Sequence, residues 1–145
     1  MAWEIAMAGA YGTAGESSRR GTNIWPDTGG GWINGRGDDT QSMLRGYAHM
    51  VEFFTSFEWW KTEPNDELVD QGAFCLAKPG EIYAIYLPKE GKVTVKLEPG
   101  NYRATWFNAF TGERFPLQAG VQGPSWTSPK TPGWLDWALL LEKQR

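Results

Sequence analysis

Apolar residues recur at helical spacing in the first half of the chain. The positions are Met43, Tyr47, Met50, Phe54 and Phe57. Steps of three and four residues place them on one face of an α-helix, and Leu44 and Val51 widen that stripe. Three residues that precede the stripe, Asp38, Asp39 and Thr40, carry side-chain oxygens suited to cap a helix start. The pattern predicts one amphipathic helix of about 18–20 residues.

The segments before and after this helix are less regular. Residues 2–8 are good helix formers, and Gly9 is a suitable stop, so a short helix is expected there. Residues 10–13 are short enough for one buried strand. The glycine-rich residues 15–37 read as a long loop, which in a compact domain indicates either a functional loop or a wrong assignment. After the long helix, Trp59 and Trp60 are expected to wedge it against its neighbour.

In the second half of the chain the period changes from helical spacing to alternation. The expected strands are residues 73–77, 81–87, 93–97, 102–106, 113–117 and 135–141. Residues 81–87 are apolar on both faces, which predicts a central strand, and Pro79-Gly80 marks a turn before it. Residues 118–133 are expected to be loop. Several short strands joined by tight turns predict an antiparallel β-sandwich.

The change of period falls at residues 61–68. The sequence therefore predicts an α+β chain in two parts: residues 1–62, with one strand and one long helix, and residues 68–145, an antiparallel β-sandwich. One strand and one long helix leave an apolar stripe without a cover. An exposed stripe of this kind indicates an interface or a risk of aggregation. We therefore expect one of three arrangements: a partner that supplies the rest of a barrel, a homo-oligomer, or a helix that folds onto the chain's own sandwich.

Charge and composition exclude several classes of partner and site. A net charge of −3 argues against nucleic acid and anionic membrane surfaces, and no apolar run approaches the roughly 20 residues of a membrane span. One cysteine and one histidine cannot build an internal disulfide or a multi-histidine metal centre, so we expect no metal and no cofactor. We expect Cys75 to be a small core residue and His49 to be a surface or partly packed one.

The aromatic content raises the question of sugar binding. Nine Trp contribute to 14% aromatic residues, and a flat ring with a polar tip suits the apolar face of a sugar, although each ring can equally be core. Hydrolysis of a glycosidic bond takes two carboxyl groups. Glu16 and Asp27 lie in the long loop with Trp25 and Trp32, and these four residues are our candidate substrate-binding site. The alternative is that both carboxylates are simply solvated.

A second aromatic group lies in the sandwich half. Trp106, Phe107 and Phe110 surround Asn108 next to a Thr-Gly turn. These rings form either a ligand-facing patch or a plug that closes one end of the sandwich, and we favour the plug.

Several segments together resemble one enzyme family. They are residues 2–16, in which a Trp-Glu helix runs into a Gly-Glu end, then Trp25 to Gly35, Phe57 to Trp60, Pro99 to Tyr102, Trp106 to Glu113 and Asp136 to Leu141. In this order they resemble the carboxy-terminal part of apiosidase-like glycoside hydrolases, over nearly the whole chain. The resemblance implies the last strand and helix of a (β/α)8 barrel, followed by the β-sandwich that this family's description links to collagen binding.

The resemblance also implies which residues would be missing. In such barrels the two catalytic carboxylates sit at the ends of the fourth and seventh strands, so both would lie upstream of Met1. Glu16 would then shape the sugar site without cleaving the bond, and no residue of this chain is expected to be catalytic. The amino end lacks the features of a secretion signal. Members of the family are often exported, and we leave the location of this chain open.

Three functions follow as hypotheses. The first is the carboxy-terminal fragment of a carbohydrate-active hydrolase, inactive alone. The second is a non-catalytic β-sandwich module that binds a polysaccharide or a fibrous protein. The third is a structural subunit that self-assembles through its exposed helix. The first two predict a carbohydrate partner, and the first also predicts association with the missing barrel portion.

Overall fold

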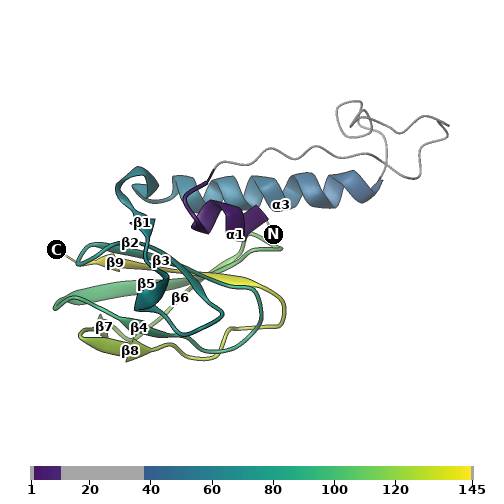
Figure 1. Ribbon diagram of the computed structural model, residues 1–145. Helices are drawn as coiled ribbons and strands as arrows, with labels where there is room; N and C mark the ends of the chain where they lie inside the picture. The colour runs from purple at the N-terminus through teal and green to yellow at the C-terminus, as the bar shows by residue number, and fades with distance from the viewer. Residues whose placement is uncertain (1, 11–37, 145) are drawn as a thin grey trace.

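The computed structural model describes residues 2–10 and 38–144, and these form three layers (Figure 1). Two helices cover one face of a large sheet, and a small sheet covers the other. The helices are α1 (Ala2–Met7) and α3 (Asp38–Thr55), and the short 3-10 turns are η1 (Trp59–Lys61) and η2 (Asp66–Leu68). The strands are β1 (Glu63–Pro64), β2 (Phe74–Lys78), β3 (Ile82–Leu87), β4 (Thr94–Lys96), β5 (Asn101–Asn108), β6 (Arg114–Pro116), β7 (Val121–Gln122), β8 (Ser125–Thr127) and β9 (Trp137–Lys143).

The large sheet has β9 near its centre. Within the described residues the strand order is β1-β2-β3-β9-β5-β6, with β7 also paired to β5, and β4 and β8 form the small sheet. All these pairings are antiparallel. In register, Leu139 of β9 lies between Ile85 of β3 and Trp106 of β5. The α+β, sandwich-type fold predicted from the sequence is confirmed for these residues.

Both faces of the large sheet are buried, each in its own core. Ile85, Trp106 and Leu139 point toward the small sheet and are fully buried there. Their sequence neighbours Ala84 and Phe107 point to the other face and pack under the helices. Because successive side chains of a strand alternate between faces, β3 must be apolar throughout, and all six of its residues are buried. The prediction of a central strand at 81–87 is confirmed.

Aromatic rings attach the helices to the sheet. Trp3 of α1 stacks on Tyr86 of β3, with ring centroids 5.3 Å apart and an interplanar angle of 9°. Phe53 of α3 is completely buried and lies 5.3 Å from both the Trp3 and Phe107 rings. The Arg114 guanidinium lies 5.0 Å above the Phe107 ring, which ties β6 to the same cluster. The helical layer and the sheet therefore share a core, and the division into residues 1–62 and 68–145 stays a prediction.

The buried face of the long helix differs from the predicted stripe. The helix itself is confirmed, with 18 residues. Its most buried residue is Phe53, which the predicted stripe leaves out, whereas Val51 and Leu44 are 57% and 40% exposed. A helix turns by about 100° per residue, so Phe53 and Phe57 share the side facing the sheet, and Phe54 lies to one side. Leu44 and Val51, which widen the predicted apolar stripe, lie on its exposed side.

Two strand predictions also need correction. The predicted loop at 118–133 contains two short strands, β7 and β8, which pair with β5 and β4. Leu135, expected to open the last strand, lies before it with a left-handed φ of 71°, and β9 begins at Trp137. The strand expected at 10–13 lies almost wholly outside the described residues.

Gly112 in the β5–β6 turn offers a test of how tightly the helix sits on the sheet. Its φ is +78°, and a Cβ built there would lie 2.8 Å from Cδ2 of His49 on α3. We expect Gly112→Ala to lower the free energy of unfolding by about 1–3 kcal/mol, from backbone strain and the clash with the imidazole. The matched control is Gly91→Ala, where a Cβ meets nothing within 4 Å. Urea titration followed by circular dichroism measures both, and equal midpoints for the two variants would contradict the prediction.

Candidate functional site

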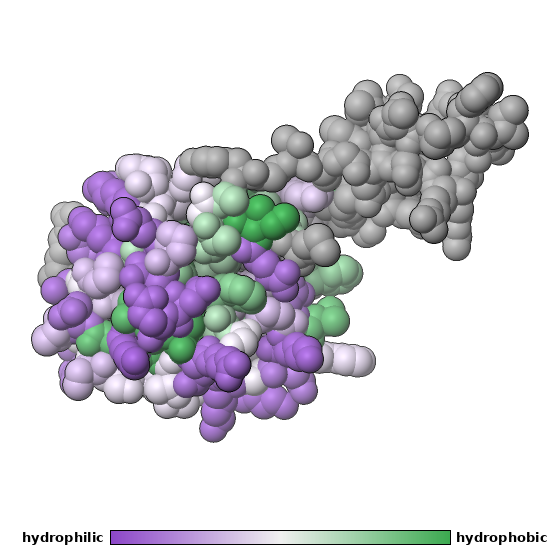
Figure 2. Space-filling view, viewed as in Figure 1, coloured by the Kyte–Doolittle hydropathy of each residue, from purple (hydrophilic) through white to green (hydrophobic). Residues whose placement is uncertain are grey.

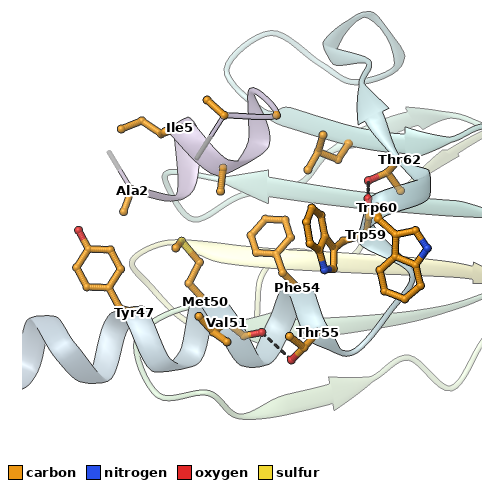
Figure 3. A pocket seen from close by; sticks show the side chains of 14 residues that line it. Ala2, Ile5, Tyr47, Met50, Val51, Phe54, Thr55, Trp59, Trp60 and Thr62 are labelled. Atoms are coloured by element: carbon orange, nitrogen blue, oxygen red, sulfur yellow. Dashed lines mark hydrogen bonds between the residues drawn. The ribbon is translucent and has the colours of Figure 1, made fainter. Parts of the chain in front are cut away.

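The two helices leave an apolar groove between them on the side away from the sheet. It encloses about 510 Å³. Its lining comes from α1, α3, the chain around η1 and one residue of β2 (Figure 3). The lining residues are Ala2, Ile5, Ala6, Gly9, Ala10, Tyr47, Met50, Val51, Phe54, Thr55, Trp59, Trp60, Thr62 and Leu76.

The groove has a packed floor and an exposed rim. Met50 and Phe54 are partly buried against the helix–sheet core and form part of the floor. On the rim, Ile5 is 40%, Val51 57% and Trp60 64% exposed. Figure 2 shows an apolar patch in the region of α1, above a sandwich surface that is mainly hydrophilic. An exposed group of apolar side chains of this kind is typical of an interface.

The side chains that line the groove are mostly apolar. Its two threonine hydroxyls donate to the carbonyls of their own turns, Thr55 to Val51 at 2.7 Å and Thr62 to Trp59 at 2.6 Å. No carboxylate lines it. Of the two rings expected to wedge the helix, Trp59 packs on the core and Trp60 stands exposed on the rim. This lining suits an apolar partner surface and not a reacting substrate.

A second, polar hollow of about 670 Å³ lies beyond the end of α3 and includes Glu58, Glu81 and Glu142. Each carboxylate has a basic partner: Lys61 for Glu58, Lys78 for Glu81 and Arg103 for Glu142. The hydrogen bond from Lys78 lowers the pKa of Glu81. A general acid for glycoside cleavage needs the opposite shift, because it must hold its proton near neutral pH. Glu81 is therefore unsuited to that role.

Burial raises the pKa of Cys75 and Tyr86, two further side chains in the core. Cys75 is fully buried, and burial, followed by the charges of Asp66 and Glu67, raises the pKa of its thiol to about 12. Cys75 is thus a small core residue, as predicted, and not a nucleophile. Burial and a hydrogen bond to Asp136 at 2.9 Å raise the pKa of Tyr86, which stays protonated and fixes the loop before β9.

The aromatic group around Asn108 divides between two cores and the surface. Trp106 and Phe107 are completely buried on opposite faces of β5, while Phe110 is 63% exposed. The Asn108 side-chain oxygen accepts hydrogen bonds from the backbone N–H groups of Phe110 and Thr111, which closes the turn. Trp106 and Phe107 are thus core residues, as the plug interpretation required, whereas the exposed Phe110 is not. Trp106 does not face a ligand.

The four candidate substrate-binding residues, Glu16, Trp25, Asp27 and Trp32, lie outside the described residues. Their role stays a prediction. His49 is partly buried on α3 beside Gly112, as expected for a partly packed histidine. Within residues 2–10 and 38–144, no three acidic, histidine or cysteine side chains are placed to hold a metal ion. No helix in the same ranges is long and apolar enough to span a membrane.

One exposed aromatic residue was missed by the sequence reasoning. Trp134 is 81% exposed in the loop before β9. Pro132 and Gly133 directly precede it, and this pair predicts a loop. A large side chain in such a loop is expected to be exposed.

Comparison with solved structures identifies the fold. A chain described as a glycoside hydrolase superposes with a TM-score of 0.76 and 13% identity over 99% of this chain, but over 35% of its own length. A glycoside hydrolase family 5 protein from Bacteroides vulgatus ATCC 8482 gives a TM-score of 0.61 and 10% identity, covering 70% of this chain and 24% of its own. No family model and no curated protein matches the sequence. The chain shares the fold of part of these glycoside hydrolases and spans about a third of the length of the first.

Proposed function

We propose that this chain forms the carboxy-terminal part of a carbohydrate-active glycoside hydrolase of the apiosidase-like type. In this proposal α1 and α3 are neighbouring helices in the outer ring of a (β/α)8 barrel. The β-sandwich supports them from outside. The observation that carries the proposal is the apolar groove between the two helices, on the side that the sandwich leaves open.

The direction of the helices supports this placement. Both begin at the same end of the molecule and run the same way over the sheet (Figure 1). Consecutive helices of a (β/α)8 barrel are parallel because a strand returns the chain between them. A strand of that barrel packs against the groove between two such helices, and an apolar lining with no charged group is what such packing requires.

The solved structures give a second line of support. Nearly the whole chain superposes on 35% of the first glycoside hydrolase, which leaves most of that protein's length for elements this chain does not supply. A barrel takes about 250 residues, more than the 145 available here. The proposal assigns the two catalytic carboxylates to that additional length and makes this chain inert alone. Glu16, Trp25, Asp27 and Trp32 would then contribute substrate contacts in the complete enzyme.

The test is to express the reading frame extended upstream through any in-frame coding sequence and to compare it with residues 1–145. We expect the extended protein to hydrolyse plant-polysaccharide oligosaccharides and the shorter chain to show no turnover. Val51→Glu should leave the stability of the shorter chain within about 0.5 kcal/mol, because Val51 is exposed there. In the extended protein the same change should cost about 3 kcal/mol or more, because it buries an unpaired charge.

Ala48→Glu is the matched control, because Ala48 is exposed on the same helix and does not line the groove. It should be tolerated in both proteins. Turnover by residues 1–145 alone, or equal tolerance of Val51→Glu in both, would contradict the proposal. So would an upstream region that encodes no barrel.

Self-assembly is the second candidate, favoured by the same exposed rim of Ile5, Val51 and Trp60. Light scattering on residues 1–145 separates the two functions. A monomer of 16.3 kDa is expected if the groove awaits a barrel. A concentration-dependent oligomer that Val51→Glu dissolves is expected if the groove binds a second copy.

A further inference from the structure

The loop between β8 and β9 presents two large apolar side chains to solvent. Trp134 is 81% exposed and Leu135 is 58% exposed, and Trp134 is the most exposed large apolar side chain in the described part of the chain. The groove between α1 and α3 does not include either residue. This surface is therefore a separate feature of the fold.

The loop is held by hydrogen bonds on both sides of Trp134. Thr131 is buried; its backbone N–H donates to Gly91 at 2.8 Å and its hydroxyl donates to the Gly133 carbonyl at 3.0 Å. The Trp137 indole N–H donates to the carbonyl of Trp134 itself at 3.1 Å. The ring is thus exposed on a backbone that is held in place. An aromatic side chain has only two χ angles to fix, so it loses little conformational entropy when it binds a ligand.

The backbone at Leu135, next to Trp134, has an unusual conformation. Its φ of 71° is the one left-handed value among the described non-glycine residues. Glycine or asparagine would adopt this conformation with less strain. Strained positions that a fold retains are concentrated at binding and catalytic sites. The strained turn thus supports a role for this surface in binding.

The loop lies at the end of the molecule where both helices begin (Figure 1). Asp136 accepts the hydroxyl hydrogen bond of Tyr86 at 2.9 Å, and Tyr86 stacks on Trp3 in the first turn of α1. In a (β/α)8 barrel the helices begin directly after the carboxyl ends of the strands, which is the face that binds substrate. If α1 and α3 belong to a barrel, Trp134 lies on the substrate side.

We propose that Trp134 is a sugar-binding platform, on which the indole stacks against a pyranose ring of a polysaccharide that extends past the active site. This inference rests on the proposed function for its placement and for the class of ligand. The size of the surface favours a sugar over a protein. One aromatic side chain buries about 150–250 Å², whereas a stable protein interface buries about 800 Å² on each partner.

The experiment is affinity electrophoresis of residues 1–145 in native gels that each contain one soluble polysaccharide. The probes are mixed-linkage β-glucan, xyloglucan, arabinoxylan and homogalacturonan. We expect retardation by at least one of them. Trp134→Ala should weaken that binding at least tenfold, and Trp134→Tyr should retain most of it because the phenol ring still stacks. Near-ultraviolet circular dichroism of each variant confirms that the fold is intact.

Trp60→Ala is the matched control, because Trp60 is also largely exposed, at 64%, but lines the groove and the hollow beyond the end of α3. It should bind like the unmodified chain. Absence of retardation by all four polysaccharides, unchanged binding by Trp134→Ala, or loss of binding by Trp60→Ala would each overturn the inference. These outcomes are independent of the proposed function, which is judged on hydrolysis by the extended protein.

Discussion

Trp106→Ala should destabilise the chain by about 3–5 kcal/mol, a large part of the stability of a domain of this size. The indole is completely buried on β5, and its ring meets that of Trp137 edge-on, with centroids 6.3 Å apart. Alanine would leave a cavity between the two sheets that neighbouring β-strands cannot close. Urea unfolding followed by circular dichroism measures the effect as a lower midpoint at unchanged slope.

Two variants serve as controls for this prediction. Phe110→Ala removes a ring that is 63% exposed near the same end of β5 and should change stability by less than about 1 kcal/mol. Trp106→Phe should be far milder than alanine, because the buried indole N–H has no hydrogen-bond partner among the described residues. A wild-type midpoint for Trp106→Ala would contradict the assignment of this ring to the core. Loss of ligand binding in that variant would report unfolding and not a lost contact.

The central strands of the sandwich were predictable because both of their faces are buried. β3 therefore reads as a continuous apolar run, and β9 was found from the alternation of Trp137, Leu139 and Leu141, with Leu140 on its second face. The first part of β5 has one covered face, with Tyr102 and Ala104 buried and Arg103 exposed, and its alternation was also predicted. In each case the pattern of apolar residues within the strand itself predicts which of its faces are buried.

The short strands could not be predicted because their own residues carry no recognisable pattern. β7 has two residues and β8 has three, too few for a period to appear. Their positions depend on partners far along the chain: Val121 lies opposite Tyr102, and Trp126 lies opposite Val95. The alternation of apolar residues at 135–141 also misplaced Leu135, whose backbone turns away before the strand starts.

The orientation of the long helix was only partly predictable. Phe53 and Phe54 are adjacent apolar residues, and the helical period alone allows either to face the sheet. The choice follows from the rings on the other side. Phe53 reaches Trp3 and Phe107 at 5.3 Å each, whereas Phe54 turns toward the groove. The sequence showed that the helix has an apolar side. It did not show how much of that side the sheet would leave uncovered.

The candidate site, like the fold, was only partly predictable from the sequence. The chemistry expected for a sugar site was assigned to Glu16, Trp25, Asp27 and Trp32, and these stay predictions. Of the covers considered for the apolar helix stripe, packing on the chain's own sandwich is observed for Phe53 and Phe57, and a partner chain or second copy stays a prediction. Trp134 escaped notice because a single exposed ring in a loop has no period to reveal it.

Phe53→Ala should release the helices from the sheet, and hydrogen exchange resolves this effect along the chain. Phe53 packs against Trp3, Phe54, Phe57 and Phe107 with ring centroids 5.3–5.5 Å apart. Removing the ring should cost about 3–5 kcal/mol. Because the core between the two sheets is a separate cluster, the loss should fall mainly on α1 and α3. We expect faster amide exchange in both helices and retained protection in β3 and β9.

The control for this prediction is Val51→Ala, two positions away on α3 and 57% exposed, which should leave exchange in all elements near that of the unmodified chain. Equal acceleration in the strands and the helices would contradict the separation of the two cores. If the helices are part of a barrel, the upstream region should suppress the effect of Phe53→Ala, because barrel strands would then hold α1 and α3 from the other side. The same exchange experiment on the extended protein thus links the stability of the helical layer to the function proposed for it.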